Sequence, residues 1–183
     1  ADMRASAAYF IANNNTMKIQ KIDNHAGMTI AGGVADAQNV TDMLRYHSNI
    51  HRIEKQEYLP IKSIARLASL IFFQNRYYPF VADILVGGYD KQGPALYNID
   101  MFGSLDKKTY VTTGSGSPVA YGLLENEYRD GLTVEEGKII ALRAVKAAIT
   151  RNIGTGEGIN GAIIDKEGYR LLTKDQKKAI ITL

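Results

Sequence analysis

The sequence contains no cysteine. This absence excludes a disulfide scaffold, a cysteine nucleophile and a thiolate metal site. Only three histidines are present, so a Ser-His-Asp triad has little to draw on. No apolar run approaches the ~18 residues that would span a bilayer, and Arg66 interrupts the most apolar stretch, residues 64–73. Because no secretory signal is visible either, we expect a cytoplasmic protein without a membrane partner.

Strong charge of one sign is also missing. The formal net charge is +3, and the Lys and Arg residues are scattered, with no basic block interleaved with aromatics. Nucleic-acid binding therefore has little support. The 183 residues, 45% hydrophobic and 22% charged, predict one soluble globular domain over residues 1–183.

Cofactor motifs are incomplete. Gly114-Ser-Gly116 and Gly154-Thr-Gly156 resemble the start of a dinucleotide fingerprint, but the third glycine would fall at Val119 or Ile159. His47 and His51 lie four residues apart on a predicted helix, and no acidic ligand of a known metal motif accompanies them. We therefore predict a surface or interface pair of histidines, and neither a metal nor a cofactor.

Hydrophobic periodicity and turn residues predict a mixed α and β chain. A capping box at Thr133–Glu136 opens a helix over 134–151, and a second box at Thr173–Gln176 opens a short C-terminal helix. The other expected helices cover residues 36–56, 61–75 and 118–128. The expected strands cover residues 1–10, 16–22, 26–31, 82–89, 95–100, 110–113, 159–164 and 169–172.

In this order, helices come in pairs between hairpins. That favours antiparallel sheets packed on each other with helix pairs outside, and it argues against a doubly wound nucleotide-binding sheet. The inward face of the first long helix is expected at Val34, Ala37, Thr41, Leu44 and Ser48.

A glycine elbow at Gly32-Gly33 follows the strand that ends near Ala31 and precedes the first long helix. Glycine lets the backbone turn sharply and approach a ligand closely. Peptide N–H groups beside a helix start can hold an anion or a developing oxyanion. Two interpretations remain open from the elbow alone: such a site, or a tight turn without chemistry.

Several motifs in register resemble proteasome β-type subunits, with the archaeal type closest. They are Asp2-x-Arg4-Ala5-Ser6, Lys18-Ile-x-Lys-Ile, Met28-Thr-x-Ala-Gly32-x-Val-x-Asp36-Ala-Gln38, Tyr78-Pro79-Phe80, Val86-Gly-Gly-Tyr89-Asp90, Thr113-Gly-Ser115-Gly-Ser117-Pro-Val-Ala-Tyr-Gly122-Leu-Leu-Glu125 and Arg151-Asn152-x-x-Thr155-Gly156-x-Gly158-Ile159. The order and spacing agree from the first residue to about Asp165.

The resemblance implies an α+β fold, the four-layer αββα sandwich of the N-terminal-nucleophile hydrolases. It also implies a threonine-type endopeptidase that degrades unfolded polypeptides inside a ring-shaped chamber of the 20S core particle. The implied partners are other β subunits in a heptameric ring, an α-type ring and, through it, an ATP-dependent unfoldase.

The implied catalytic residues are Asp2, Lys18, Gly32, Ser115, Asn152 and Thr155. Lys18 would lower the pKa of the threonine nucleophile, Asp2 would hold Lys18, and the Gly32 N–H would stabilise the oxyanion. Ser115 would hydrogen-bond near the threonine amine. Ser6 would contact the substrate backbone. Ala5, Thr16, Gln20, Ile30 and Val34 would line a largely apolar pocket, which predicts cleavage after hydrophobic side chains.

The sequence departs from the family pattern in two ways. The threonine nucleophile and its strand have no counterpart, because Ala1 aligns inside the family's mature chain; a chain beginning there would be inactive by itself. We expect that upstream residues exist, the alternative being a truncated non-catalytic form. The family's late-loop aspartate is Asn152 and its partner serine is Thr155, so a catalytically silent structural β subunit is the second hypothesis. A stand-alone amidase of the same fold fits less well, since no groups for a small amide ligand are evident.

Overall fold

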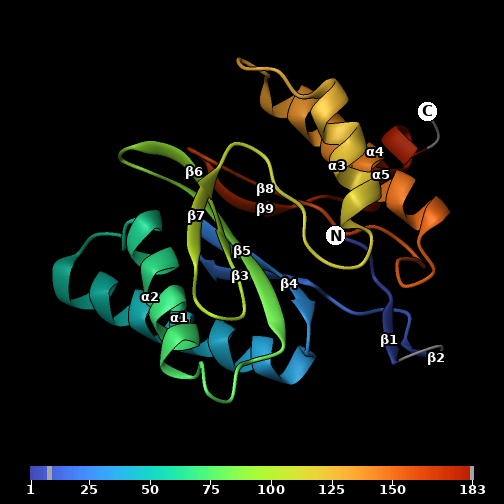
Figure 1. Ribbon diagram of the computed structural model, residues 1–183. Helices are drawn as coiled ribbons and strands as arrows, with labels where there is room; N and C mark the ends of the chain where they lie inside the picture. The colour runs from blue at the N-terminus through green and yellow to red at the C-terminus, as the bar shows by residue number, and fades with distance from the viewer. Residues whose placement is uncertain (8–9, 182–183) are drawn as a thin grey trace. The chain divides into compact units, whose positions relative to one another are not determined.

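The computed structural model describes residues 1–7 and 10–181 (Figure 1). The chain forms two compact units. The first unit comprises residues 1–19, 112–163 and 170–183, and the second unit comprises residues 20–111 and 164–169. Among the helices described, none has the length and apolar character needed to cross a membrane.

The second unit is built on a five-stranded sheet with the order β3-β4-β5-β6-β7. Pairing is antiparallel from β4 through β7. In β5, buried residues alternate with more exposed ones, as expected for a strand with one face on a core. The strands are β3 (Ile19–Asp23), β4 (Ala26–Gly32), β5 (Ala82–Asp90), β6 (Gly93–Ile99) and β7 (Leu105–Lys108).

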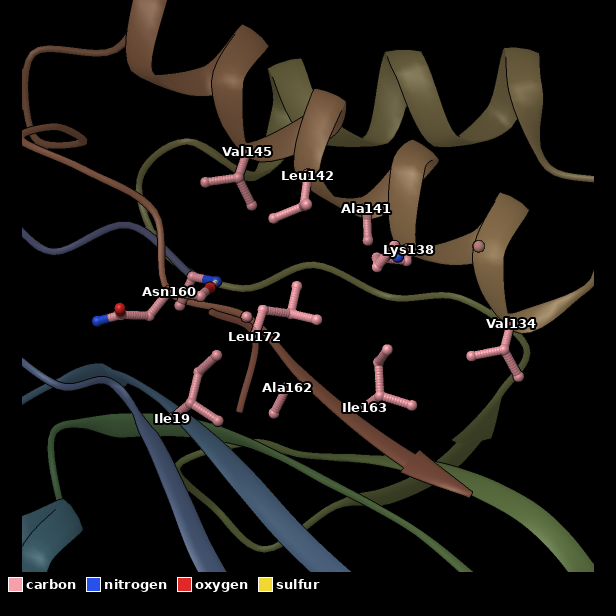
Figure 2. Close-up of a pocket in the computed structure, with 13 residues that line it drawn as sticks. Ile19, Val134, Lys138, Ala141, Leu142, Val145, Asn160, Ala162, Ile163 and Leu172 are labelled. Atoms are coloured by element: carbon pink, nitrogen blue, oxygen red, sulfur yellow. Dashed lines mark hydrogen bonds between the residues drawn. The ribbon is translucent and has the colours of Figure 1, made fainter. Parts of the chain in front are cut away.

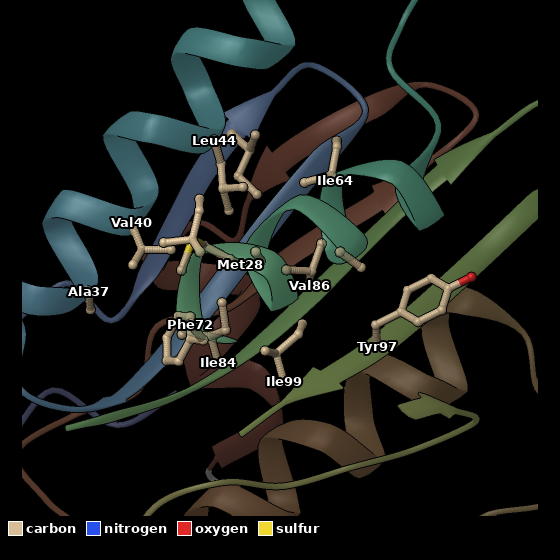
Figure 3. Close-up of a cluster of buried hydrophobic side chains, with 14 of the residues drawn as sticks. Met28, Ala37, Val40, Leu44, Ile64, Phe72, Ile84, Val86, Tyr97 and Ile99 are labelled. Atoms are coloured by element: carbon tan, nitrogen blue, oxygen red, sulfur yellow. The ribbon is translucent and has the colours of Figure 1, made fainter. Parts of the chain in front are cut away.

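Two helices, α1 (Val34–Lys55) and α2 (Ile61–Gln74), pack on this sheet and enclose the main core. Figure 3 shows the side chains of this core meeting between helices and strands. Their spacing on α1 follows the helical period. The labelled members are Ala37, Val40 and Leu44 from α1, Ile64 and Phe72 from α2, and Met28, Ile84, Val86, Tyr97 and Ile99 from the strands.

The expected inward face of α1 is correct at four positions and wrong at Val34, whose side chain is 44% exposed. A helical side chain covers the turn that precedes its own Cα, and Val34 is the first residue of the helix. Val34 therefore has no earlier helical turn to pack over, and Val40 completes the buried stripe instead.

The predicted strand over 110–113 is also wrong, because these residues form a bend and irregular backbone. The strand at this edge of the sheet is β7, where Leu96↔Lys108 and Ile99↔Leu105 are partners. Its sequence, Leu-Asp-Lys-Lys, carries little strand propensity of its own. Pairing with β6 therefore outweighs local preference, and charged side chains are typical of such an edge.

In the first unit, α3 (Ser117–Glu127) packs on α4 (Val134–Arg151) through Ala120, Ala144 and Ala148. α4 has the predicted bounds, and its capping box is complete between Thr133 and Glu136. The second predicted box is present as well, with Thr173 and Gln176 exchanging hydrogen bonds at the start of α5 (Lys174–Ile181).

The segment expected as one strand over 1–10 instead contains β1 (Ala5–Ala7) and the first residue of β2 (Phe10–Asn13), while residues 8–9 of that prediction lie outside the described residues. β1 pairs antiparallel with β2, for example at Ser6↔Ile11. The last hairpin consists of β8 (Ala162–Asp165) and β9 (Gly168–Leu171), close to the predicted bounds.

Candidate active site

Asp2 and Lys18 form an ion pair in the first unit. Lys18 Nζ lies 2.6 Å from Asp2 Oδ1, and the side chains of Lys18 and Asp2 are only 21% and 12% exposed, respectively. Lys18 immediately precedes β3, and the Asp2 backbone forms an antiparallel bridge with Ile159. Hydrogen bonds between charged partners are shorter and stronger than neutral ones. The structure thus brings together the lysine and the acid that the sequence predicted as a pair.

The second carboxylate oxygen of Asp2, Oδ2, also accepts hydrogen bonds. Asp2 Oδ2 accepts hydrogen bonds from the backbone N–H groups of Arg4 (3.2 Å) and Gly156 (3.1 Å). The carboxylate is therefore held from both sides, by its own segment and by the loop that follows α4. Its other oxygen, Oδ1, accepts the hydrogen bond from Lys18.

Asn152, at the C-terminal end of α4, forms a cluster with two other predicted residues, Ser115 and Thr155. Asn152 Oδ1 accepts hydrogen bonds of 2.9 Å from the hydroxyls of Ser115 and Thr155 and from the N–H of Gly154. Asn152 Nδ2 donates to Ser115 O at 3.0 Å. Because three donors converge on one atom of the Asn152 amide, that atom is the oxygen. The amide nitrogen is then the donor to Ser115 O.

The Asn152 cluster and the Asp2–Lys18 pair are neighbours within the first unit. Thr155 is 8% exposed, and the next residue, Gly156, donates to Asp2. Thr155 also lies close to the segment that carries Ser115. The residue after Ser115 is Gly116, and a Cβ added to Gly116 would lie only 2.8 Å from Thr155 Oγ1. Five of the six predicted catalytic residues are thus linked by short contacts: Asp2, Lys18, Ser115, Asn152 and Thr155.

The sixth, Gly32, lies in the second unit at the end of β4. Its φ is +107°, and a Cβ there would come within 2.3 Å of Val81 O. The turn continues with a 2.6 Å hydrogen bond from Gly33 N–H to Val81 O, and Asp36 Oδ2 accepts one from Val81 N–H. The positive φ and the close approach of Val81 O are sufficient reasons for a glycine at position 32. The presence of glycine there is therefore no evidence for an oxyanion site, and the oxyanion role of Gly32 stays a prediction.

The predicted substrate-binding residues are divided between the units. In the first, Ala5 and Ser6 lie on β1, and the N–H of Thr16 donates to Met3 O at 2.9 Å. In the second, Gln20 Oε1 accepts from Arg45 at 3.1 Å, and Ile30 is 9% exposed within the core cluster. Ser6 and Val34 are the exposed members of this group. Their role as a substrate pocket stays a prediction.

Sequence reasoning placed Arg4 beside the candidate site residues but predicted no role for it. Arg4 Nη1 donates to Ile153 O at 2.6 Å, and Nη2 lies 2.7 Å from Glu157 Oε1. Both partners belong to the loop that carries Thr155. The signal was present in the motif Asp2-x-Arg4, which places Arg4 two residues after the acid, but the sequence does not show what the side chain reaches.

A cavity of about 310 Å³ lies in the first unit, and its lining contains none of the predicted site residues, although Ala1 and Ile19 adjoin Asp2 and Lys18 in the chain (Figure 2). Side chains from α4 point toward Asn160, Ala162, Ile163 and Leu172 across it. The lining is mostly apolar, with Lys138 as its charged member; Lys138 forms an ion pair with Glu135. No sequence motif pointed to this cavity.

Metal-binding chemistry is not evident in the described part of the chain, where no three His, Asp or Glu residues gather as a metal site would require. His47 is exposed and packs edge-on against Tyr46, with ring centroids 5.4 Å apart.

The family model described as "Proteasome subunit" matches residues 1–164. The chain belongs to the proteasome subunit family. It is 78% identical over 183 residues to "Proteasome subunit beta 2" of Nitrosopumilus maritimus (strain SCM1), covering 100% of this chain and 87% of the relative. Identity is 73% to "Proteasome subunit beta 2" of Cenarchaeum symbiosum (strain A), with the same coverage. Identity to "Proteasome subunit beta" of Methanosarcina thermophila is 39% over 180 residues, covering 98% of this chain and 86% of the relative.

These similarities confirm the resemblance read from the motifs: the chain is a proteasome β-type subunit. The mixed α+β structure with its five-stranded antiparallel sheet is consistent with the N-terminal-nucleophile hydrolase fold that we expected. Membership of the proteasome family suggests a role in protein degradation as part of a protease, and it supports other proteasome subunits as partners.

Proposed function

We propose that this β-type subunit is a threonine-type endopeptidase that cleaves unfolded polypeptides within the proteasome core particle. The observation that carries the proposal is the Lys18–Asp2 pair, with an N–O separation of 2.6 Å and little solvent exposure. An ammonium held beside a hydroxyl favours the deprotonated hydroxyl by Coulomb attraction, and beside an amine it favours the neutral form by repelling the protonated one. That is the activation that a weak threonine nucleophile needs at neutral pH.

Each remaining residue has a role in the proposal. An N-terminal threonine attacks the peptide carbonyl, and its own α-amine accepts the proton, directly or through a water molecule. The Gly32 N–H stabilises the oxyanion, and Ser115, held by Asn152, hydrogen-bonds near the amine. Ser6 binds the substrate backbone. The residues proposed to contact the substrate side chain, Ala5, Thr16, Gln20, Ile30 and Val34, include no carboxylate, which favours hydrophobic side chains before the cleaved bond.

The assembly is part of the same proposal. The subunit would join a heptameric β ring stacked with α-type rings in the cytoplasm, and an ATP-dependent unfoldase would deliver substrates through the α ring. Enclosing the sites keeps folded proteins away, so access contributes to specificity. Native mass spectrometry of the purified protein tests this directly, because a free monomer would contradict the ring.

A second candidate, a structural β subunit without catalysis, is favoured by one observation. Asn152 provides a neutral amide where the family pattern has a carboxylate, so the hydroxyls of Ser115 and Thr155 donate to an uncharged oxygen. Neutral acceptors bind donors more weakly than charged ones. Such a subunit would complete a ring with an active partner.

One experiment separates the two candidates. The protein is purified as the cell makes it, its N-terminus is sequenced, and its intact mass is measured before and after treatment with a peptide electrophile directed at N-terminal threonine. An N-terminal threonine that gains one adduct supports the endopeptidase. Another N-terminal residue without an adduct supports the structural subunit.

A further inference from the structure

The loop from Ile153 to Gly158 connects the end of α4 to the residues before β8, and it carries Thr155 of the proposed site. Within this loop, Glu157 has a positive φ of 67°, which non-glycine residues rarely adopt. Such a backbone conformation persists only where surrounding contacts determine it. The contacts of Arg4 meet this requirement.

Arg4 bridges two points of this loop with one side chain. Its Nη1 donates to the carbonyl of Ile153 at 2.6 Å, and its Nη2 pairs with Glu157 Oε1 at 2.7 Å. The side chain is 20% exposed. The two bonds thus span the segment that contains Thr155, from the residue after Asn152 to the residue with positive φ.

The guanidinium also lies against the backbone between these two points. A Cβ on Gly156 would come within 2.4 Å of Arg4 Cζ, so glycine is what allows the close approach. From the same N-terminal segment, Met3 N–H donates to Gly156 O at 3.2 Å and Asp2 Oδ2 accepts from Gly156 N–H. Gly156 is therefore held by Asp2 and Met3 through its backbone, and it is covered by Arg4.

We propose that Arg4 is a positioning residue, which fixes the loop from Ile153 to Gly158 so that Thr155, Asn152 and Asp2 keep the geometry of the site. This inference rests on the proposed endopeptidase function. Arg4 acts through the loop, because the atoms it binds are Ile153 O and Glu157 Oε1. Without this bridge, Gly156 N–H loses its fixed place beside Asp2, and the acid that holds Lys18 gains freedom.

The planar fork of arginine is essential to the inference. It donates from two nitrogens in fixed directions, whereas a lysine ammonium is a single point charge on a flexible stem. Arg4→Lys therefore keeps the positive charge near Asp2 and loses the simultaneous bridge. The variant separates positioning from electrostatics.

The test compares Arg4→Lys with wild type in the assembled protein. Displacement of catalytic groups by about 1 Å can cost about 100-fold in rate, so we expect kcat for a hydrophobic fluorogenic peptide to fall about tenfold while KM changes less than about twofold. Hydrogen exchange of the peptide covering residues 152–158 should become faster, since the loop loses its two bonds to Arg4 and the Gly156 N–H is held less firmly against Asp2 Oδ2. Arg143→Lys, which alters an Arg–Glu pair of 2.8 Å between α4 and α3, is the matched control and should leave both measurements unchanged.

Gly156→Ala provides a second test that keeps Arg4 itself, because the added methyl group displaces the guanidinium; it should reproduce the effects of Arg4→Lys. Wild-type kcat and wild-type loop exchange in Arg4→Lys would overturn the inference, as would faster exchange with unchanged kcat. An assembled wild-type protein without peptidase activity would instead contradict the proposed function, and the two failures are thereby distinguished.

Discussion

The backbone N–H of Gly156 donates a hydrogen bond of 3.1 Å to Oδ2 of Asp2, a residue 154 positions earlier in the chain. The other oxygen of the same carboxylate binds Lys18. One aspartate thus joins the loop after α4 to the lysine on which the proposed chemistry depends. Because its two oxygens have separate partners, a disturbance of the loop reaches Lys18 through a single side chain.

Replacing Lys18 by alanine should abolish peptide hydrolysis with little effect on assembly. The proposed nucleophile loses the charge that lowers its pKa, and removal of such a group costs about 100-fold or more in kcat. The measurement is steady-state hydrolysis of a hydrophobic fluorogenic peptide. Lys91→Ala is the matched control, because it removes an exposed lysine of a 2.8 Å ion pair with Glu57 in the second unit. Undiminished hydrolysis by Lys18→Ala would contradict the proposed mechanism.

Asn152→Ala should destabilise the protein by about 1–3 kcal/mol, because it removes the partner of four polar groups, of which the Thr155 hydroxyl and the Gly154 N–H are partly buried. The affected groups are the hydroxyls of Ser115 and Thr155, Gly154 N–H and Ser115 O. Chemical denaturation gives the free energy of unfolding. Asn49→Ala, which removes an exposed contact with Arg52, should change it by less than about 0.5 kcal/mol. Equal effects of the two substitutions would show that the cluster contributes no stability.

Three glycine-to-alanine substitutions should differ in sign and size. Gly32→Ala combines a φ of +107° with a Cβ 2.3 Å from Val81 O, and should destabilise by about 2–5 kcal/mol. Gly93 has a φ of +97° but open space where a Cβ would lie, so Gly93→Ala should destabilise the protein by about 1–2 kcal/mol. Gly122→Ala lies inside α3 with open space, and should stabilise by about 0.5–1 kcal/mol. Thermal unfolding of the three variants gives their order, and any other order would show that backbone strain at Gly32 and Gly93 is not what sets these costs.

The pH dependence of stability should change in Glu136→Gln. The backbone N–H of Thr133, followed by its hydroxyl and by Arg129, holds the pKa of Glu136 below the ordinary 4.5. A lowered native pKa gives a stabilising contribution that is present above pH 4.5 and is lost as the pH falls through the native value. Wild type should therefore be more stable than Glu136→Gln at about pH 7, and the two should converge in acid.

Denaturant titrations at several pH values measure this difference. The box formed by Thr173 and Gln176 already contains the neutral amide, so the chain itself shows that Gln can occupy this position. If the difference in free energy of unfolding between wild type and Glu136→Gln stays the same from neutral pH into acid, the charge of Glu136 does not contribute to stability.

Much of the local structure is predictable from the sequence. Helix α4 begins at Val134 and ends at Arg151 as expected, because its capping box and apolar spacing act over a few residues. The second capping box follows in the same way, and β9 lies within one residue of its expected bounds, whereas β8 begins three residues later than expected. The predicted strand at 110–113 failed because β7 depends on pairing with β6, an interaction between segments that no local pattern encodes.

The candidate site was predicted only in part. The family motifs pointed to Asp2, Lys18, Ser115, Asn152 and Thr155, and the structure links all five through short contacts. The contacts of Arg4 with Ile153 and Glu157 were not predictable, because a side chain of that length can reach many partners.

The sequence by itself determined the helix starts, the glycine turn at Gly32 and the identity of the family, since each depends on residues close together or on motifs in register. Only the tertiary structure decided which distant atoms meet: Asp2 with Gly156, Ser115 with Asn152, and Arg4 with Glu157. The physical reason is range. Capping and backbone strain act within a few residues, whereas these contacts form only after folding has brought segments about 150 or 40 positions apart together.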